Sequence, residues 1–242
     1  MSLGTPETLS GNSTGSIRLQ TLRKHHISSA AQLCAQAMVS VPSYFQIYAS
    51  FKDETTRVCE LQWLLEKNLH LIHKSYPSAL RCAYCEMDGK GPDLACFFII
   101  VPRSVSKFSL FEKLVAGLAL LPFRSGLSVY NRLIATMDYF DRQFDEIEAE
   151  QPGPCLELQR MSVKPAFQGK GVGTHCLRQA LQEADDAGYF VILSTQKSVN
   201  VSFYERLGFL TVRESDFTPC GNGSGEAYHN WFMVRSPQLR PT

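Results

Sequence analysis

The sequence predicts an α/β protein, and two observations carry this prediction. Residues 155–163 mix apolar and polar positions as a strand does, and they lead through a glycine loop into a helix-like segment at 174–187. Residues 79–87 and 94–101 flank the turn-like segment 88–92 and predict a hairpin of strands. Strands and helices therefore alternate along one chain, as expected for helices packed on a sheet.

Length and composition describe an ordinary globular protein. The 242 residues are 44% hydrophobic and 19% charged, which is typical of a soluble chain with a substantial core. The formal net charge of +1 gives no argument for a nucleic acid or an anionic membrane as partner. Residues 1–15, rich in Ser, Thr and Gly, predict a disordered leader. The longest apolar run, 114–123, is too short to cross a bilayer.

The eight cysteines predict free thiols in a reducing cytoplasm, because no secretory signal precedes them. Cys82 and Cys85 have the spacing of half a metal or redox site. No second pair and no nearby histidine accompanies them, and on a strand these two side chains point to opposite faces. We therefore expect no metal.

The first hundred residues predict a strand, two helices and the hairpin. Residues 16–22 alternate as a strand does, and residues 25–40 carry apolar side chains at helical spacing up to Pro42, which is expected to end the helix. Residues 53–74 predict a second amphipathic helix. Residues 94–101 are almost continuously apolar, which favours a central strand covered on both faces.

Two further helices are predicted within residues 102–154, at 110–121 and 127–148. A stripe on the second helix is expected to pack on the core; it comprises Ile134, Met137, Phe140, Phe144 and Ile147. The same region is acidic through Asp138, Asp141, Asp145, Glu146, Glu148 and Glu150. A solvated helix face explains these carboxylates, and attraction of a cationic amine is the alternative.

The glycine loop predicts a phosphorylated ligand. The strand 155–163 stops at Lys164-Pro165, and glycines 169, 171 and 173 then alternate before the helix. Glycine lets backbone amides turn inward, and the N-terminus of a helix adds further unpaired N–H groups that bind phosphate. A Walker loop requires Lys followed by Ser or Thr, and a dinucleotide fingerprint requires G-x-G-x-x-G and a later acid. The sequence has neither pattern.

A different family fits these residues. The pattern Gln168-x-x-Gly171-x-Gly173, behind a strand that ends in Val163-x-Pro165, resembles the acetyl-CoA loop of the GNAT superfamily of N-acetyltransferases. The block 200–209 is similar to the second signature of that family, and 231–235 to its closing strand. Within the superfamily, the chain is most similar to the branch that contains puromycin N-acetyltransferase and many fungal acetyltransferases.

The resemblance implies a fold, a domain and a reaction. The fold is a mostly antiparallel, mixed and twisted sheet of about seven strands flanked by helices, in one domain over 16–236. The helical insertion 102–154 then lies beside the acceptor pocket, between the third and fourth strands. The implied reaction is direct transfer of acetyl from acetyl-CoA to the primary amine of a small molecule, in a monomer or homodimer. Protein or peptide acetylation is one alternative, and a non-catalytic acyl-CoA-binding module is another.

The resemblance also implies which residues contact acetyl-CoA. Main-chain groups of Met161, Ser162 and Val163 are expected to align and polarise the thioester. The amides of a second set are expected to hold the pyrophosphate: Gln168, Gly169, Lys170, Gly171, Val172, Gly173 and Thr174. Asn200 and Phe203 are expected to contact the cofactor arm.

Two residues are candidates for proton transfer. Tyr204 is similar to the tyrosine that many family members use as the general acid for the leaving thiolate, and a core tyrosine is the alternative. Glu157 falls where histone-acetylating members place their base, and a water chain is the alternative. By strand alternation, Glu157, Gln159, Met161 and Val163 are expected to share the face that looks into the pocket.

Overall fold

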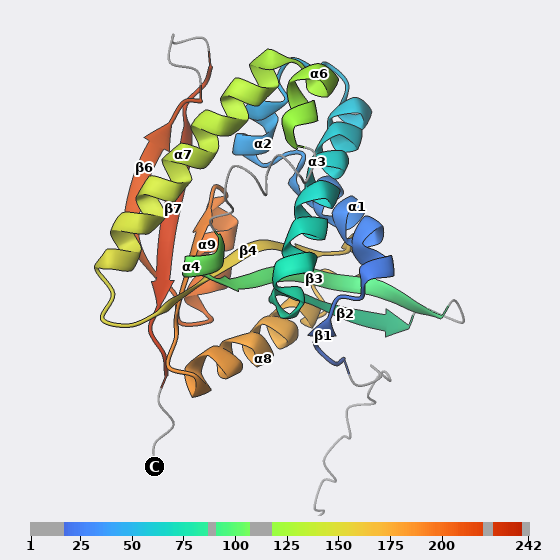
Figure 1. Cartoon of the computed structure of the whole chain (residues 1–242). Helices are drawn as coiled ribbons and strands as arrows, with labels where there is room; N and C mark the ends of the chain where they lie inside the picture. Colours follow the sequence, from blue (N-terminus) through green and yellow to red (C-terminus); the bar gives the residue numbers. More distant parts are fainter. Residues whose placement is uncertain (1–16, 87–90, 107–117, 220–224, 239–242) are drawn as a thin grey trace, which may run out of the picture.

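The computed structural model describes residues 17–86, 91–106, 118–219 and 225–238, and its centre is a twisted seven-stranded sheet (Figure 1). The strand order is β1-β2-β3-β4-β5-β7-β6. Neighbouring strands are antiparallel except β4 and β5, which are parallel. This arrangement confirms the predicted fold class. The strands are β1 (Gln20–Thr21), β2 (Leu80–Glu86), β3 (Pro92–Pro102), β4 (Cys155–Val163), β5 (Phe190–Thr195), β6 (Leu210–Phe217) and β7 (Tyr228–Arg235).

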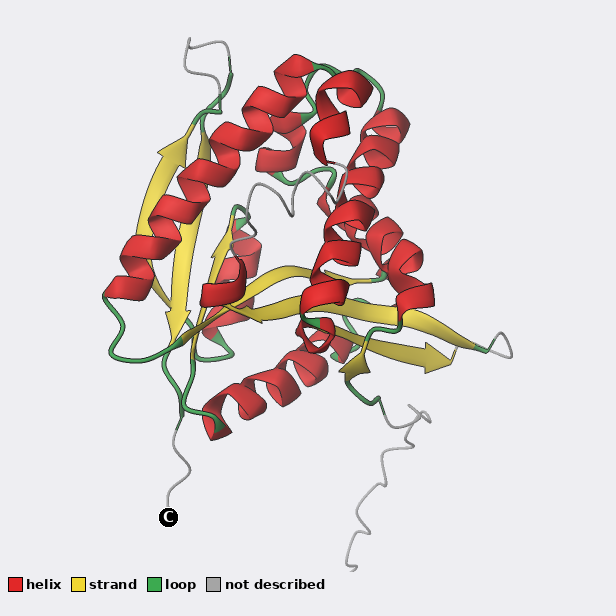
Figure 2. Cartoon of the chain, viewed as in Figure 1, coloured by secondary structure: helices red, strands yellow, loops and turns green. Residues whose placement is uncertain are grey.

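Helices cover both faces of the sheet (Figure 2). One face carries α1 (Ile27–Met38), α2 (Pro42–Ile47), α3 (Glu54–Ser75), α6 (Leu121–Ser125) and α7 (Leu127–Ala149). The other face carries α8 (Val172–Asp186) and α9 (Ser198–Glu205). Short helical turns complete the described chain: α4 (Arg103–Ser106) and the 3-10 turns Lys24–His26, Pro77–Ala79, Leu118–Leu120 and Pro165–Phe167. No helix of the described chain combines the length and apolarity needed to cross a membrane.

The apolar run in β3 is explained by this double coverage. Phe97, Ile99 and Val101 lie in the core beneath α1 and α3, whereas Phe98 and Ile100 lie in the core beneath α8. Both sets of side chains are buried, since alternate residues of a strand point to opposite faces. The prediction of a central strand is confirmed.

The N-terminal predictions are correct in outline and wrong at two places. The second helix is confirmed as α3, and its N-cap Asp53 accepts the N–H of Thr56 at 2.7 Å. The strand expected over 16–22 is shorter in the structure: its paired part is β1, Gln20–Thr21, which lies beside β2. Pro42 does not end the first helix, because α1 already ends at Met38; Pro42 is the first residue of α2. Proline has no N–H, and the first residue of a helix needs none.

The predicted long helix of the insertion is confirmed as α7. Its stripe is partly wrong, because Ile134 is 36% exposed, whereas Phe144 and Ile147 are buried. The buried face is instead completed by Val129, Leu133, Thr136 and Tyr139. The helix predicted over 110–121 falls largely on residues 107–117, which lie outside the described residues.

The cysteines that the structure describes are free thiols. Cys82 is buried under α1 and α3, and Cys85 packs on the opposite core, as strand geometry predicted. In the described part of the chain, no cluster of three His, Cys, Asp or Glu side chains is placed to hold a metal ion.

Candidate functional site

Strand β4 changes face at a bulge around Arg160. Gln159 pairs with Ile99 of β3, but Phe97, two residues away on β3, pairs with Ser162. The chain therefore has one residue more on β4 than on β3, and Arg160 takes the left-handed φ of 54°.

Because of the bulge, the side chains of β4 do not alternate between the two faces of the sheet as expected from the sequence. Glu157 and Gln159 line the pocket on the face of α1, α3 and α7. Met161 and Val163 also border the pocket, but their side chains pack against the core beneath α8. The four side chains therefore do not share one face. The sequence pattern of period two does not reveal an inserted residue.

Strands β4 and β5 separate before the bulge, after Glu157. Their parallel pairing runs from Cys155–Phe190 to Glu157–Ile192 and goes no further. The later residues of both strands, 159–163 and 194–197, line a single pocket. Unpaired backbone of two parallel strands therefore borders this pocket.

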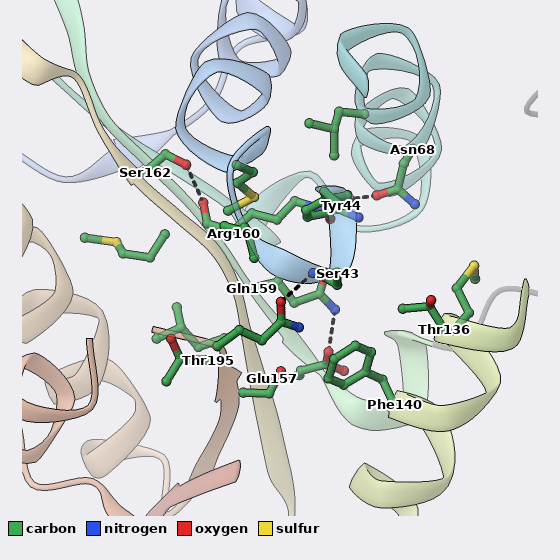
Figure 3. Close-up of a pocket in the computed structure, with 18 of the residues that line it drawn as sticks. Ser43, Tyr44, Asn68, Thr136, Phe140, Glu157, Gln159, Arg160, Ser162 and Thr195 are labelled. Atoms are coloured by element: carbon green, nitrogen blue, oxygen red, sulfur yellow. Dashed lines mark hydrogen bonds between the residues drawn. The ribbon is translucent and has the colours of Figure 1, made fainter. Parts of the chain in front are cut away.

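The pocket has a volume of about 720 Å³. Helices α1, α2, α3 and α7 form its walls together with β4, and Tyr204 of α9 lies at the β5 side. In Figure 3, Phe140 and Thr136 of α7 face Tyr44 and Asn68 across it, with Glu157 and Gln159 on β4. This volume is in the range of sites for small ligands.

Helix α7 is tied to α2 by Arg132. Its guanidinium donates to the carbonyls of Gln46 at 2.8 Å and Ile47 at 3.4 Å, and to the hydroxyl of Ser50 at 2.8 Å. These carbonyls belong to the last turn of α2, where carbonyl oxygens lack the full set of N–H donors that a following helical turn would supply. The insertion is thus joined to the N-terminal helices across the pocket.

A buried arginine organises the end of the pocket beneath α7. Arg103 is 1% exposed and donates to Glu157 at 2.8 Å and to Asp145 at 2.6 Å. Asp141 and Glu148 of α7 lie within 3.7 and 3.8 Å of the same guanidinium. Burial alone would lower the pKa of Arg103, but Glu157 and Asp145 raise it. The sequence pattern does not reveal the role of Arg103, since its partners lie 38 to 54 residues further along the chain.

Glu157 lies in the pocket, as expected, and both of its oxygens are engaged. Oε2 accepts from Arg103, and Oε1 accepts from Gln159 Nε2 at 2.9 Å. The side chain is buried with 7% of its surface exposed. Uptake of a proton at Glu157 would weaken this ion pair.

Tyr204 also lines the pocket. Its ring packs between Phe203 and Phe209, with centroids 5.1 and 5.6 Å away. No described residue forms a hydrogen bond with its hydroxyl. Burial raises the pKa of Tyr204, so the hydroxyl is protonated at neutral pH and able to donate.

The two other residues expected on the cofactor arm differ in their placement. Asn200 lines the same pocket as Tyr204, and its Nδ2 donates to Thr195 Oγ1 at 3.1 Å. Phe203 does not line the pocket and packs on the α8 core. The spacing of a short helix therefore brings Asn200 and Tyr204 together and directs Phe203 elsewhere.

The glycine loop forms an open end on α8. The helix begins at Val172, two residues earlier than predicted, and Gly171 precedes it with φ 76°. Among the described residues, no backbone N–H of 169–174 donates to a backbone carbonyl, and no side chain caps the helix. Gly173 is needed for close packing, because a Cβ there would lie 2.9 Å from a methyl of Val163. Free amides and the positive end of a helix form an anion site next to Gln168, which lines the pocket.

Comparisons with known proteins agree with this geometry. Residues 97–209 match the Acetyltransferase (GNAT) family. The fold is similar to arylalkylamine N-acetyltransferase 2 from Aedes aegypti, at 15% identity and a TM-score of 0.53 over 93% of this chain and all of that one. It is also similar to polyamine N-acetyltransferase from Drosophila melanogaster, at 12% identity and a TM-score of 0.55 over 91% of this chain and all of that one. A structure from Corynebacterium glutamicum, described as histone acetyltransferase HPA2 and related acetyltransferase, is also similar. It has 14% sequence identity and a TM-score of 0.55, over 94% of this chain and 99% of that one.

Proposed function

We propose that this chain, whose residues 97–209 match the Acetyltransferase (GNAT) family, takes its acyl group from acetyl-CoA and acetylates the primary amine of a small molecule. The observation that carries the choice of acceptor is the wall that α7 adds to the pocket. Arg132 joins α7 to α2 above a pocket of about 720 Å³. An extended peptide needs an open groove, whereas a small amine needs a pocket of this kind.

Acetyl-CoA is proposed to enter from the glycine loop. The free amides of 169–174 receive the pyrophosphate, with Gln168 beside them. The pantetheine arm then runs between β4 and β5, where the strands have parted, along the backbone of 161–163 and past Asn200. This path ends beside Glu157 and Tyr204, so the thioester meets the acceptor within the pocket.

The transfer is proposed to occur directly in a ternary complex. The neutral amine attacks the thioester carbonyl carbon, the C–S bond breaks, and the amide C–N bond remains. The Tyr204 hydroxyl gives its proton to the departing thiolate. The proton lost by the amine leaves towards Glu157, directly or through water, because this carboxylate lines the pocket in which the amine is proposed to bind.

Two further features support a small amine. The arylalkylamine and polyamine enzymes of the same fold are named for acceptors of this class. The resemblance of the sequence to the branch that contains puromycin N-acetyltransferase points the same way. Free thiols at every described cysteine support a reducing compartment such as the cytoplasm, where the enzyme is expected to act as a monomer or homodimer.

The proposal is tested by the release of CoA thiol from acetyl-CoA. Purified full-length protein is given monoamines, diamines, amino acids and arylalkylamines in one set, and lysine-containing and free N-terminal peptides in another. We expect thiol release above the acceptor-free rate with small amines, and a mass gain of one acetyl group on the amine. Faster turnover of the peptides would overturn the choice of acceptor and favour a protein acetyltransferase.

A further inference from the structure

Arg160 stands in an unfavourable backbone conformation. It is the one non-glycine residue of the described chain with a positive φ, 54°. The left-handed region costs an L-residue on the order of 1–2 kcal/mol relative to the right-handed one. Glycine would form the same bulge without that cost. An arginine at this position is therefore explained by its side chain and not by the turn.

The side chain of Arg160 lines the acceptor pocket without an anionic partner. Its Nη1 donates to the amide oxygen of Asn68 on α3 at 2.5 Å, next to Tyr44 (Figure 3). Among the described residues, no carboxylate lies within ion-pair distance of this guanidinium. Asn68 uses one of five N–H donors, and the others remain for a ligand.

The other arginine of the pocket has a different environment. Arg103 is surrounded by carboxylates, and two of them lie within 2.8 Å. Its charge is satisfied within the protein. Arg160 is half-buried in a pocket whose lining also includes the apolar residues Leu64 and Leu65. A partly desolvated charge without a partner favours an anionic ligand.

We propose that Arg160 is the specificity-determining residue of this pocket and that its guanidinium binds a carboxylate carried by the acceptor amine. This inference rests on the proposed function and narrows its substrate class to amino carboxylates. A guanidinium matches a carboxylate through two parallel N–H···O bonds. Glu157 lies three residues earlier on the same strand, so the reacting amine and the carboxylate are separated by a chain of several bonds.

The test uses matched acceptors with acetyl-CoA and the full chain. An ω-amino acid, its primary amide and the alkylamine of equal chain length are compared in series of four and six carbons. We expect kcat/KM for the amino acid to exceed that for the amide by about 10- to 100-fold, the range of hydrogen bonds to charged groups. Calorimetry on the CoA-saturated protein gives the affinity for each acceptor without turnover.

Two variants and one control assign the preference to Arg160. Arg160→Gln should reduce the ratio of kcat/KM for the amino acid over kcat/KM for its amide to about one, and Arg160→Lys should retain part of this preference. Lys197→Gln is the control, because Lys197 lines the same pocket and donates to the neutral Ser40 hydroxyl at 3.2 Å; its preference ratio should persist.

The outcomes separate the two proposals. Equal turnover and equal affinity for amino acid, amide and alkylamine would refute the role of Arg160 and leave small-amine acetylation standing. A preference that survives in a folded Arg160→Gln protein would refute it as well. Turnover of peptides with neither turnover nor binding of any small amine would refute both proposals.

Discussion

Arg103 Nη1 and Glu157 Oε2 lie 2.8 Å apart in a buried ion pair that joins the insertion to the central sheet. Arg103 directly follows β3, Glu157 belongs to β4, and Asp145 of α7 binds the same guanidinium. One side chain therefore fixes both the carboxylate in the pocket and the helix above it. This buried pair predicts a large loss of folding stability when either partner is removed.

Replacing Arg103 should destabilise the fold. Arg103→Met keeps the length of the side chain and leaves the Glu157 carboxylate buried without its cation, which costs about 3–5 kcal/mol when a buried pair is broken. Urea unfolding measures the loss. In the double variant with Glu157→Gln, much of the loss should be recovered. If Arg103→Met unfolds at the wild-type urea concentration, the pair does not stabilise the fold.

A second buried pair should make stability depend on acid pH. Arg235 donates to both oxygens of Asp185 at 2.6 and 2.8 Å, beneath the C-terminal part of α8. Burial alone would raise the pKa of Asp185, but the hydrogen bonds from Arg235 and from the backbone N–H of Gln238 hold it below its usual value. A depressed folded pKa means that the stabilisation is complete above the unfolded pKa of about 3.9 and is lost as the pH falls below it.

The measurement compares the wild type with Asp185→Asn. At neutral pH the variant should be less stable by about 3 kcal/mol, because Arg235 is left without its anion. The difference in unfolding free energy between the two proteins should shrink below about pH 4, as Asp185 becomes protonated in the wild type. A constant difference from pH 7 to pH 3 would show that the pair is not the cause.

Gly171 tests the phosphate site. No described atom lies within 4 Å of a Cβ built at Gly171, so the Cβ itself causes no clash, and the strain of a side chain at φ 76° is common to the variants compared. Gly171→Asp should weaken acetyl-CoA binding by about tenfold or more, because it adds a negative charge at the helix end where the pyrophosphate is proposed to bind. Gly171→Asn is the matched control, since asparagine tolerates positive φ and carries no charge. Thermal shifts with acetyl-CoA compare the variants, and equal shifts would argue against this site.

Phe140 tests the role of the insertion. Its side chain lines the pocket from α7, which is a different element from the glycine loop. Phe140→Ala should change the ranking of acceptor amines and leave the KM for acetyl-CoA within about twofold. The ring contacts that it also loses, with Tyr139, Phe144 and Phe232, should appear as a lower melting temperature. Ile134→Ala on the exposed side of α7 is the control and should change neither quantity. If Phe140→Ala changes only the KM for acetyl-CoA, the cofactor lies on this side of the pocket.

The sequence was sufficient for the elements and for one side of the site. The limits of β4, the long α7, and the meeting of Asn200 with Tyr204 all follow from local periodicity and motif spacing. Arg160 could not be predicted from the sequence. A bulge is one extra residue relative to the neighbouring strand, and the apolar–polar pattern of its own strand does not show it. Arg103 could not be predicted either, since its partners come from α7 and β4 and meet it only in the folded chain.

Tyr204→Phe decides between a general acid and a core tyrosine. The hydroxyl has no described hydrogen-bond partner, whereas the ring packs against Phe203 and Phe209. Removing the oxygen should therefore leave the melting temperature nearly unchanged. The kcat should fall by about 10²-fold or more with acetyl-CoA affinity nearly intact, since a general acid acts chiefly in the transition state.

The pH profile adds a second criterion, because burial raises the pKa of Tyr204. The wild type should retain its acid, and hence its kcat, through the mildly alkaline range where an ordinary phenol begins to ionise, at a pKa of about 10. Tyr139→Phe is the control, because Tyr139 is also largely buried and bonds Ser215 at 2.6 Å outside the pocket; it should lower stability and preserve kcat. A folded Tyr204→Phe enzyme with the wild-type kcat would leave solvent to protonate the thiolate.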